Sequence, residues 1–197
     1  MAVLGLDLSL TSTGMVVLSS KGKIIFNGTA GYGLKKGTIT DEIKRLEDIV
    51  CAVEEVLGEY PVKYAVIEDY AYNQIKKGVT MITKQAELTG PVKMICRQYN
   101  KEVIVVTASQ ARKLTFERPV GTTSAERKQG ITVKMKIAKM VKTDFDLEFK
   151  TEDEADAFVL AEAVRRISGG AGPLSPEQIM SLRKIEKRAK GGKKRGK

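Results

Sequence analysis

The stretch 1-MAVLGLDLSLTSTGMVVLSS-20 decides the fold, because it places one acidic residue inside a run of apolar residues. Residues 2–8 (AVLGLDL) have the composition of a buried strand that carries Asp7 near its end. Small residues at 11–14 form a turn, and residues 14–20 (GMVVLSS) form a second strand. Lys21-Gly22 turns the chain into a third strand, residues 23–29. Three antiparallel strands are therefore expected first.

The rest of the chain alternates between helical and strand patterns. Apolar residues recur at helical spacing before Gly58, and a proline at 91 predicts a bend in a later helix. Helices are expected at 39–58, 80–99, 108–113, 131–142 and 152–167, strands at 62–68 and 102–107, and loops at 31–38 and 115–130. This order predicts an α/β fold in which antiparallel strands are followed by parallel ones in a mixed sheet flanked by helices.

The composition changes after Ser168. Residues 168–176 (SGGAGPLSP) have the character of a linker, and a short helix is expected at 176–189. From Arg183 to the last residue the chain holds nine Lys or Arg and one Glu. We therefore expect one domain at 1–168, followed by a linker and basic tail at 169–197 that contacts phosphates.

The charge balance predicts a polyanionic partner. The 197 residues carry a formal net charge of +10, and nucleic acid is the usual partner of such a basic chain. The sequence has no histidine, which excludes His-based zinc sites and Ser-His-Asp triads. Its two cysteines, Cys51 and Cys96, form no disulfide framework, and we expect a reducing, cytoplasmic environment without signal peptide or membrane span.

Four carboxylates occupy positions where a charge needs a cation. Asp7 lies within an apolar strand, and Glu68 ends the apolar strand VKYAVI. Asp153 and Asp156 are three residues apart and share one face of the last helix. A buried carboxylate is costly unless it is paired, and oxygen-only ligands favour Mg²⁺, with Mn²⁺ as the alternative. Taken singly, each acid could instead cap a turn, pair with a lysine or face solvent.

The ordered set of motifs resembles the RuvC-like Holliday junction resolvases of the RNase H-like superfamily. The motifs are GLDLSLTSTG (5–14), AVIEDYAYN (65–73), VTASQARK (106–113), VGTTSAERKQ (120–129) and DEADAFVLAEA (153–163). The similarity extends over about residues 1–167, and the Ser/Thr-rich turn and basic tail are more similar to phage-type or organellar-type members. It implies an endonuclease that nicks four-way junctions symmetrically by two-metal-ion phosphodiester hydrolysis, with Asp7, Glu68, Asp153 and Asp156 as metal ligands and catalytic acids.

The resemblance also implies residues that contact DNA. The first basic position near the cut falls on Arg112 or Lys113, and the second falls on Arg127 or Lys128, with a longer stretch between them than in the family. An aromatic residue that disturbs base stacking is expected just after the second acid. Tyr70 and Tyr72 flank that position, and rim packing explains both equally well.

The implied partners are branched DNA and a second copy of the chain, with no membrane. A homodimer suits the two-fold symmetry of a four-way junction. The apolar residues of the helix 80–99 form either the dimer interface or a face of the core: Met81, Ile82, Leu88, Val92 and Ile95. A host cytoplasm or an organellar matrix are alternatives to a cellular cytoplasm.

Three other functions share parts of this pattern. A related nuclease would cut RNA–DNA hybrids, flaps or forks with the same acids. A non-catalytic module on this fold would bind nucleic acid only, which the intact acids disfavour. An ATP-binding protein of the actin and sugar-kinase type also opens with a strand, an Asp and a Ser/Thr/Gly turn, but 197 residues leave little room for its two domains.

Overall fold

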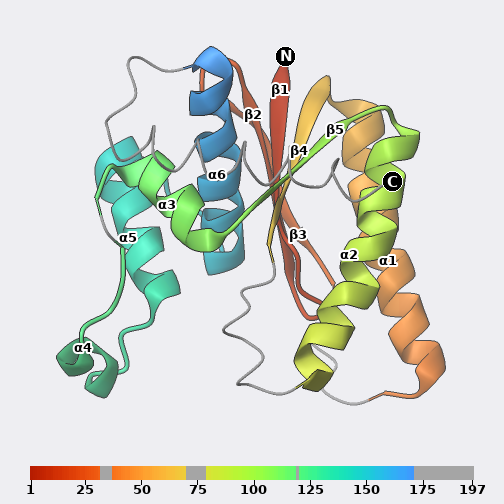
Figure 1. Ribbon diagram of the computed structural model, residues 1–197, viewed down its shortest axis with the longest axis horizontal. Helices are drawn as coiled ribbons and strands as arrows, with labels where there is room; N and C mark the ends of the chain where they lie inside the picture. Colours follow the sequence, from red (N-terminus) through yellow and green to blue (C-terminus); the bar gives the residue numbers. More distant parts are fainter. Residues whose placement is uncertain (32–36, 70–78, 119, 171–197) are drawn as a thin grey trace, which may run out of the picture.

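The fold centres on one mixed five-stranded sheet. The computed structural model describes residues 1–31, 37–69, 79–118 and 120–170. Its strands are β1 (Ala2–Asp7), β2 (Thr13–Ser19), β3 (Ile24–Ala30), β4 (Val62–Glu68) and β5 (Glu102–Val106), in the order β3-β2-β1-β4-β5 (Figure 1). Strand β2 pairs antiparallel with both β1 and β3, whereas β4 pairs parallel with β1 and β5 pairs parallel with β4. The predicted mixed sheet is confirmed.

Helices cover both faces of the sheet. On one side lie α1 (Ile39–Glu59) and α2 (Val79–Gln98), and on the other lie α3 (Ala108–Phe116), α5 (Val133–Phe145) and α6 (Glu152–Arg165) (Figure 1). A short π-helical turn, η2 (Arg166–Gly170), continues α6, and the short helix α4 (Ser124–Lys128) stands apart from these layers. The central strands β1 and β2 are buried on both faces, which explains their apolar runs, whereas the edge strands β3 and β5 are mostly half-buried.

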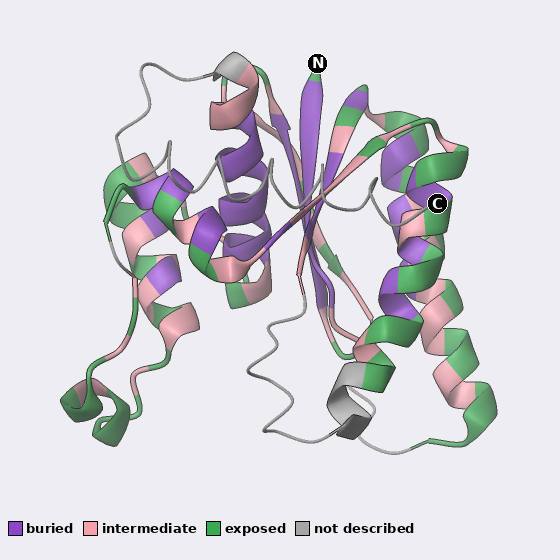
Figure 2. Cartoon of the chain, viewed as in Figure 1, coloured by how far each residue is buried: buried purple, intermediate pink, exposed green. Residues whose placement is uncertain are grey.

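Two apolar clusters fill the layers on either side of the sheet (Figure 2). Leu4 and Leu6 of β1 point to the α1–α2 side with Ile49 and Leu88, while Val3 points to the α6 side with Phe158. This alternation follows from the two-residue period of a strand. Asp7 therefore belongs by parity to the side of Val3, where α6 lies.

Threonine residues define where most helices begin. Thr38, Thr107, Thr123 and Thr151 each accept a hydrogen bond from a backbone N–H of the first turn and are completed by an acidic or glutamine side chain three residues later. Such capping boxes satisfy backbone donors that have no partner within the helix. They fix the start of α1 and α6 at the edge of the sheet where β1 ends.

Several boundaries differ from those the sequence predicts. Helix α1 continues through Gly58 to Glu59, and α3 extends to Phe116, because Leu114 and Phe116 are buried in the core. The expected loop at 115–130 contains α4, which its own capping box stabilises. Helix α2 runs through Pro91. The expected helix at 176–189 and the rest of the tail lie outside the described residues.

Two glycines allow the backbone of α6 to lie directly on the sheet. A Cβ atom on Gly5 would come within 2.8 Å of the backbone nitrogen of Ala161 and even nearer to the carbonyl of Ala157. A Cβ on Gly14 would meet the carbonyl of Asp153. Since backbone atoms cannot move aside as a flexible side chain can, both positions require glycine. The contact places the first turn of α6 beside the end of β1.

The described residues contain no helix that is long and apolar enough to cross a membrane.

We predict that Gly5→Ala lowers the free energy of unfolding by about 3 kcal/mol or more, because the added methyl group must push α6 away from β1. Gly90→Ala is the matched control, since its Cβ would meet nothing within 4 Å on the exposed side of α2. Alanine there should stabilise the helix by up to about 1 kcal/mol. Denaturant unfolding measures both, and equal midpoints for Gly5→Ala and the wild type would refute the packing argument.

Candidate active site

The four acids predicted from the sequence come from three elements that meet at one edge of the sheet. Asp7 ends β1 and Glu68 ends β4, and these strands are parallel neighbours in which Leu6 pairs with Ile67. Asp153 and Asp156 lie in the first two turns of α6. A hollow of about 470 Å³ opens here, lined by residues that include Asp7, Glu68 and Asp156. The carboxyl ends of parallel strands are the usual place for a site in such sheets.

Lys134 holds the carboxylates together. Its Nζ lies 3.0 Å from Oδ2 of Asp7, 2.5 Å from Oδ1 of Asp153 and 3.4 Å from Oδ2 of Asp156. Lys134 stands in the first turn of α5, whose first N–H groups are capped by Thr132. One ammonium group thus pairs with acids from β1 and from α6. Three carboxylates converge on one cationic atom.

Burial and repulsion between carboxylates raise the pKa values of Asp7, Glu68 and Asp156. Loss of hydration raises the pKa of Glu68 to about 7, with further increases from Asp7 and Asp156. The same causes raise the pKa of Asp156 to about 6, and burial also raises the pKa of Asp7. Lys134 and Arg112 oppose each shift. Burial lowers the pKa of Lys134, but the surrounding carboxylates raise it by more.

Arg112 adds a second cation with unused hydrogen-bonding capacity. It lies in α3 and lines the same hollow as Asp7 and Glu68. Within the described part of the chain, its Nε atom is buried and has no hydrogen-bond partner. A buried donor of this kind is costly to leave unpaired, and such exceptions point to a missing ligand. A phosphate oxygen would satisfy it, because guanidinium groups bind phosphates with paired donors.

The donor set fits a hard divalent cation. Among the described residues, no three His, Cys, Asp or Glu side chains are preformed as a metal site. Lys134 Nζ lies between the carboxylates of Asp7 and Asp153. The acids at this hollow offer carboxylate oxygens, which Mg²⁺ and Mn²⁺ prefer. Burial, followed by repulsion from Asp7, raises the pKa values of Glu68 and Asp156. A divalent ion beside these carboxylates would favour their ionised forms.

The predicted basic residues divide into two groups. Arg112 lines the hollow, whereas its neighbour Lys113 is exposed and does not. Arg127 and Lys128 are both exposed on α4, where Arg127 donates hydrogen bonds to the side chain and carbonyl of Thr122. Neither α4 residue lines the hollow of the acids. Tyr70 and Tyr72 lie outside the described residues.

Sequence reasoning missed Lys134, although a signal was available. The first turn of a helix favours acidic side chains because the N-terminus carries partial positive charge. Helix α5 has no acid in its first turn and a lysine instead. Lys134 lies three residues before the buried Ile137, so the helix points it to the same side as the core. The signal was therefore a positive charge at Lys134, in a helix turn that favours acids and on the side of the helix that faces the core.

The apolar residues of the helix 80–99 could form either a dimer interface or a face of the core. Leu88 and Val92 are fully buried and Ile95 is 9% exposed, and all three pack in the core of their own chain. For these three residues, the structure supports the core face. The side chains of Met81 and Ile82 lie outside the described part. Helical periodicity alone cannot distinguish a core face from an interface.

Comparisons with known proteins identify the family of this chain and structures of similar fold. Residues 3–164 match the family described as "Crossover junction endodeoxyribonuclease RuvC". The fold is similar to a structure of T. thermophilus RuvC in complex with Holliday junction substrate, with a TM-score of 0.62 and 18% identity over 89% of this chain and 99% of that chain. A structure described as Thermus thermophilus RuvC has a TM-score of 0.64 at 16% identity, over 89% of this chain and 100% of the other. No curated protein matches in sequence.

We predict that Glu68→Gln stabilises the metal-free protein at pH 8 by about 2 kcal/mol and has little effect at pH 5. The folded-state pKa of Glu68 is raised to about 7, so the folded state binds more protons than the unfolded state. The contribution of Glu68 to stability is therefore greatest below pH about 4.5 and falls as the pH rises through 7. Denaturant unfolding in EDTA at both pH values measures the difference.

The control is Glu55→Gln, an exposed acid on α1. It should change stability little at either pH. A gain for Glu68→Gln that is the same at pH 5 and pH 8 would show that its ionisation does not destabilise the fold.

Proposed function

The chain belongs to the RuvC family of crossover junction endodeoxyribonucleases, and from this premise we propose how its residues cut DNA. It is a divalent-metal-dependent endonuclease of branched DNA. The observation that carries the residue assignment is the convergence of three carboxylates on Lys134, with Glu68 and Arg112 lining the same hollow. We propose that it cleaves four-way junctions by symmetric nicks.

We propose that Asp7, Glu68, Asp153 and Asp156 hold the metal. When bound, the divalent metal supplies a Lewis acid for the scissile phosphate and lowers the pKa of water, and a pair of ions can serve both sides of the phosphate. Mg²⁺ is our first choice for the ion, and Mn²⁺ is the alternative, since both prefer oxygen ligands. The acids from β1 and β4 fix the site to the sheet, and those from α6 close it from one side.

Lys134 and Arg112 are proposed to face the scissile phosphate. Both are cations that line the hollow of the acids, and the Nε atom of Arg112 has a donor to offer. Lys134 exchanges its carboxylate partners for a phosphate oxygen when DNA and metal enter. Fixed cations around a phosphate stabilise the charge that builds up during its displacement.

The helix α4 is proposed to contact DNA away from the cut. Lys136 donates to Glu126 and to the carbonyl of Gly121, and the hydrogen bonds from Lys136 and Thr123 lower the pKa of Glu126 to about 2. Glu126 is the only acid of α4 and stays ionised, but the ammonium group of Lys136 offsets its charge. Arg127 and Lys128 therefore give α4 a positive surface. The basic tail from Arg183 onward is proposed to add affinity that does not depend on sequence.

We further propose a homodimer that acts in the cytoplasm. A four-way junction has two-fold symmetry, and two symmetric nicks require two sites. The described cysteines Cys51 and Cys96 are free, which suits a reducing compartment. Because residues 3–164 match a nuclease family, we do not retain the alternative function, an ATP-binding protein of the actin or sugar-kinase type.

We predict that Asp7→Asn folds normally and lowers the rate of junction cleavage by about 10³-fold or more, because the change removes a ligand charge worth several kcal/mol in the transition state. The assay uses end-labelled four-way junction, Y-fork, flap, linear duplex and RNA–DNA hybrid, each with Mg²⁺, Mn²⁺ or EDTA. Paired nicks in the junction, absent with EDTA, are expected. Near-normal cleavage by folded Asp7→Asn would overturn the metal assignment, and preferred cutting of forks, flaps or hybrids would change the proposed substrate.

We predict that Arg127→Ala/Lys128→Ala makes the salt dependence of junction binding shallower. The negative slope of log binding constant against log salt concentration should shrink in magnitude by about 2, since each phosphate contact contributes roughly 0.9. The rate of cleavage by saturating protein should change little. Lys134→Ala removes one proposed phosphate contact, so it should reduce the magnitude of the slope by only about 1 but lower that rate by about 10² to 10³-fold. Junction binding as a function of salt and single-turnover cleavage measure the two effects.

The matched control is Lys21→Ala/Lys23→Ala. These exposed lysines lie in the turn between β2 and β3, at the opposite edge of the sheet from Asp7. Loss of two charges there should leave the slope nearly unchanged. An equal decrease in both double variants would mean that α4 acts only through net charge.

A further inference from the structure

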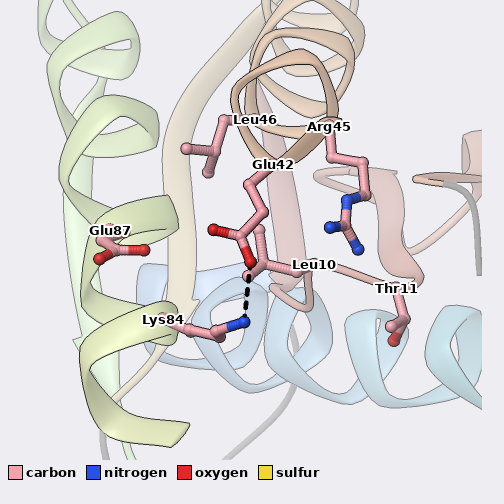
Figure 3. Close-up of a pocket in the computed structure, with 7 residues that line it drawn as sticks. All are labelled: Leu10, Thr11, Glu42, Arg45, Leu46, Lys84 and Glu87. Atoms are coloured by element: carbon pink, nitrogen blue, oxygen red, sulfur yellow. Dashed lines mark hydrogen bonds and ion pairs between the residues drawn. The ribbon is translucent and has the colours of Figure 1, made fainter. Parts of the chain in front are cut away.

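A second hollow adjoins the active site. It has a volume of about 270 Å³ and lies between the turn after β1, the first turns of α1 and the first half of α2 (Figure 3). Leu10, Thr11 and Lys84 line both this hollow and the one that holds the acids. The two hollows therefore adjoin each other, and a strand whose phosphate lay at the acids would pass close to the second one.

The lining of this second hollow does not suit a phosphate. Leu10 and Leu46 provide apolar surface, as Figure 3 shows. Arg45 and Lys84 bring two positive charges, but Glu42 and Glu87 bring two negative ones. Lys84 Nζ lies 3.0 Å from Oε1 of Glu42, so one cation is already paired across the hollow. A lining with apolar sides and balanced charges favours a flat, neutral group with polar edges.

The walls of this hollow are held in place by local hydrogen bonds. The capping box of Thr38 and Asp41 fixes the start of α1, and Arg45 Nε donates to the carbonyl of Asp41. In the turn after β1, Ser9 N donates to Oγ1 of Thr13, which donates back to the carbonyl of Ser9. The turn and the helix that supply Leu10 and Leu46 are thus built before any ligand binds. A preformed hollow is the usual form of a small-ligand site.

We propose that this hollow binds one unstacked nucleobase of the strand that is cut, next to the scissile phosphate. This inference rests on the proposed function. Its volume lies below the roughly 300–1,000 Å³ typical of drug-sized ligands, which suits one ring system and not a whole nucleotide. Enzymes that take a base out of the stack hold it between apolar side chains and read its edge with hydrogen bonds. The carboxylate of Glu87 accepts from base amino groups, and Arg45 donates to base oxygens and nitrogens.

A nucleobase bound in this hollow would help to position the scissile phosphate. Bases next to the crossing point of a junction are the least costly to unstack, because their neighbours are not continuous. A base that enters this hollow fixes the sugar–phosphate unit beside it and so positions the scissile phosphate at the acids. The contacts to its edge would make cleavage depend on which base lies there.

The test combines a variant that fills the hollow with DNA that lacks the base. Leu46→Trp places a large ring in the hollow, and Glu47→Trp places the same ring on the exposed side of α1 as the matched control. Each protein cleaves intact junctions and junctions with one abasic site at each of three nucleotides on either side of the cut. Leu46→Phe is a smaller addition that serves if Leu46→Trp fails to fold.

Loss of one well-held base is expected to lower the single-turnover rate of the wild type by about tenfold, at one nucleotide position. Leu46→Trp should lower cleavage of intact junction by a similar factor and show no further loss on that abasic junction. Glu47→Trp should behave as the wild type. Wild-type rates for Leu46→Trp on intact DNA, or the same loss from Leu46→Trp on every abasic junction, would overturn the proposal.

A binding measurement separates this proposal from the proposed function. The protein has no Trp, so the fluorescence of 2-aminopurine placed near the cut reports unstacking against a low background. Asp7→Asn binds the labelled junction without cutting it, and the 2-aminopurine fluorescence should rise at one position. The double variant Asp7→Asn/Leu46→Phe, which fills the hollow without adding a Trp, should show a smaller rise or none. Failure of the wild type to cut any junction would sink the proposed function alone. Binding without a fluorescence change at any position would sink the base-binding proposal alone.

Discussion

The active site depends on how closely α6 can approach β1 and β2. Gly5 and Gly14 have no Cβ atoms, so backbone atoms of Ala157 and Asp153 lie where those methyl groups would be. The axis of α6 is therefore fixed by backbone contact and not by side chains that can repack. This contact brings Asp153 and Asp156 to the strand that carries Asp7. A small change at either glycine would move the acids of the helix relative to the acids of the sheet.

The site divides its charges between two kinds of element. The carboxylates come from the sheet edge and from α6, which pack tightly and are almost wholly buried. The cations Arg112 and Lys134 come from α3 and α5, which pack on α6 from outside. Rigid elements hold the groups that repel each other, because only a fixed backbone can keep like charges close together. The elements outside them supply the balancing charges.

Sequence reasoning predicted those parts of the site that burial makes conspicuous. Asp7 and Glu68 are charged residues at the ends of apolar strands, which made them candidates for a functional site. The mixed sheet was predicted separately, from the order of the strands along the chain. Lys134 was not predicted, because it is one of several lysines on its helix. Its importance becomes visible only when the structure places that helix beside the acids. The same limit applies to α2, where Leu88 has the spacing of an interface and the surroundings of a core. Patterns identify which residues are buried, but not what they are buried against.

Lys134 occupies the position among the acids where we propose that a metal ion binds. The ammonium group is an internal counter-ion that occupies the space among Asp7, Asp153 and Asp156. If these carboxylates hold the metal as proposed, an incoming cation must displace the ammonium group from them. Binding of the ion and movement of the Lys134 side chain would then be coupled, so that the affinity for metal would depend on where the lysine can go.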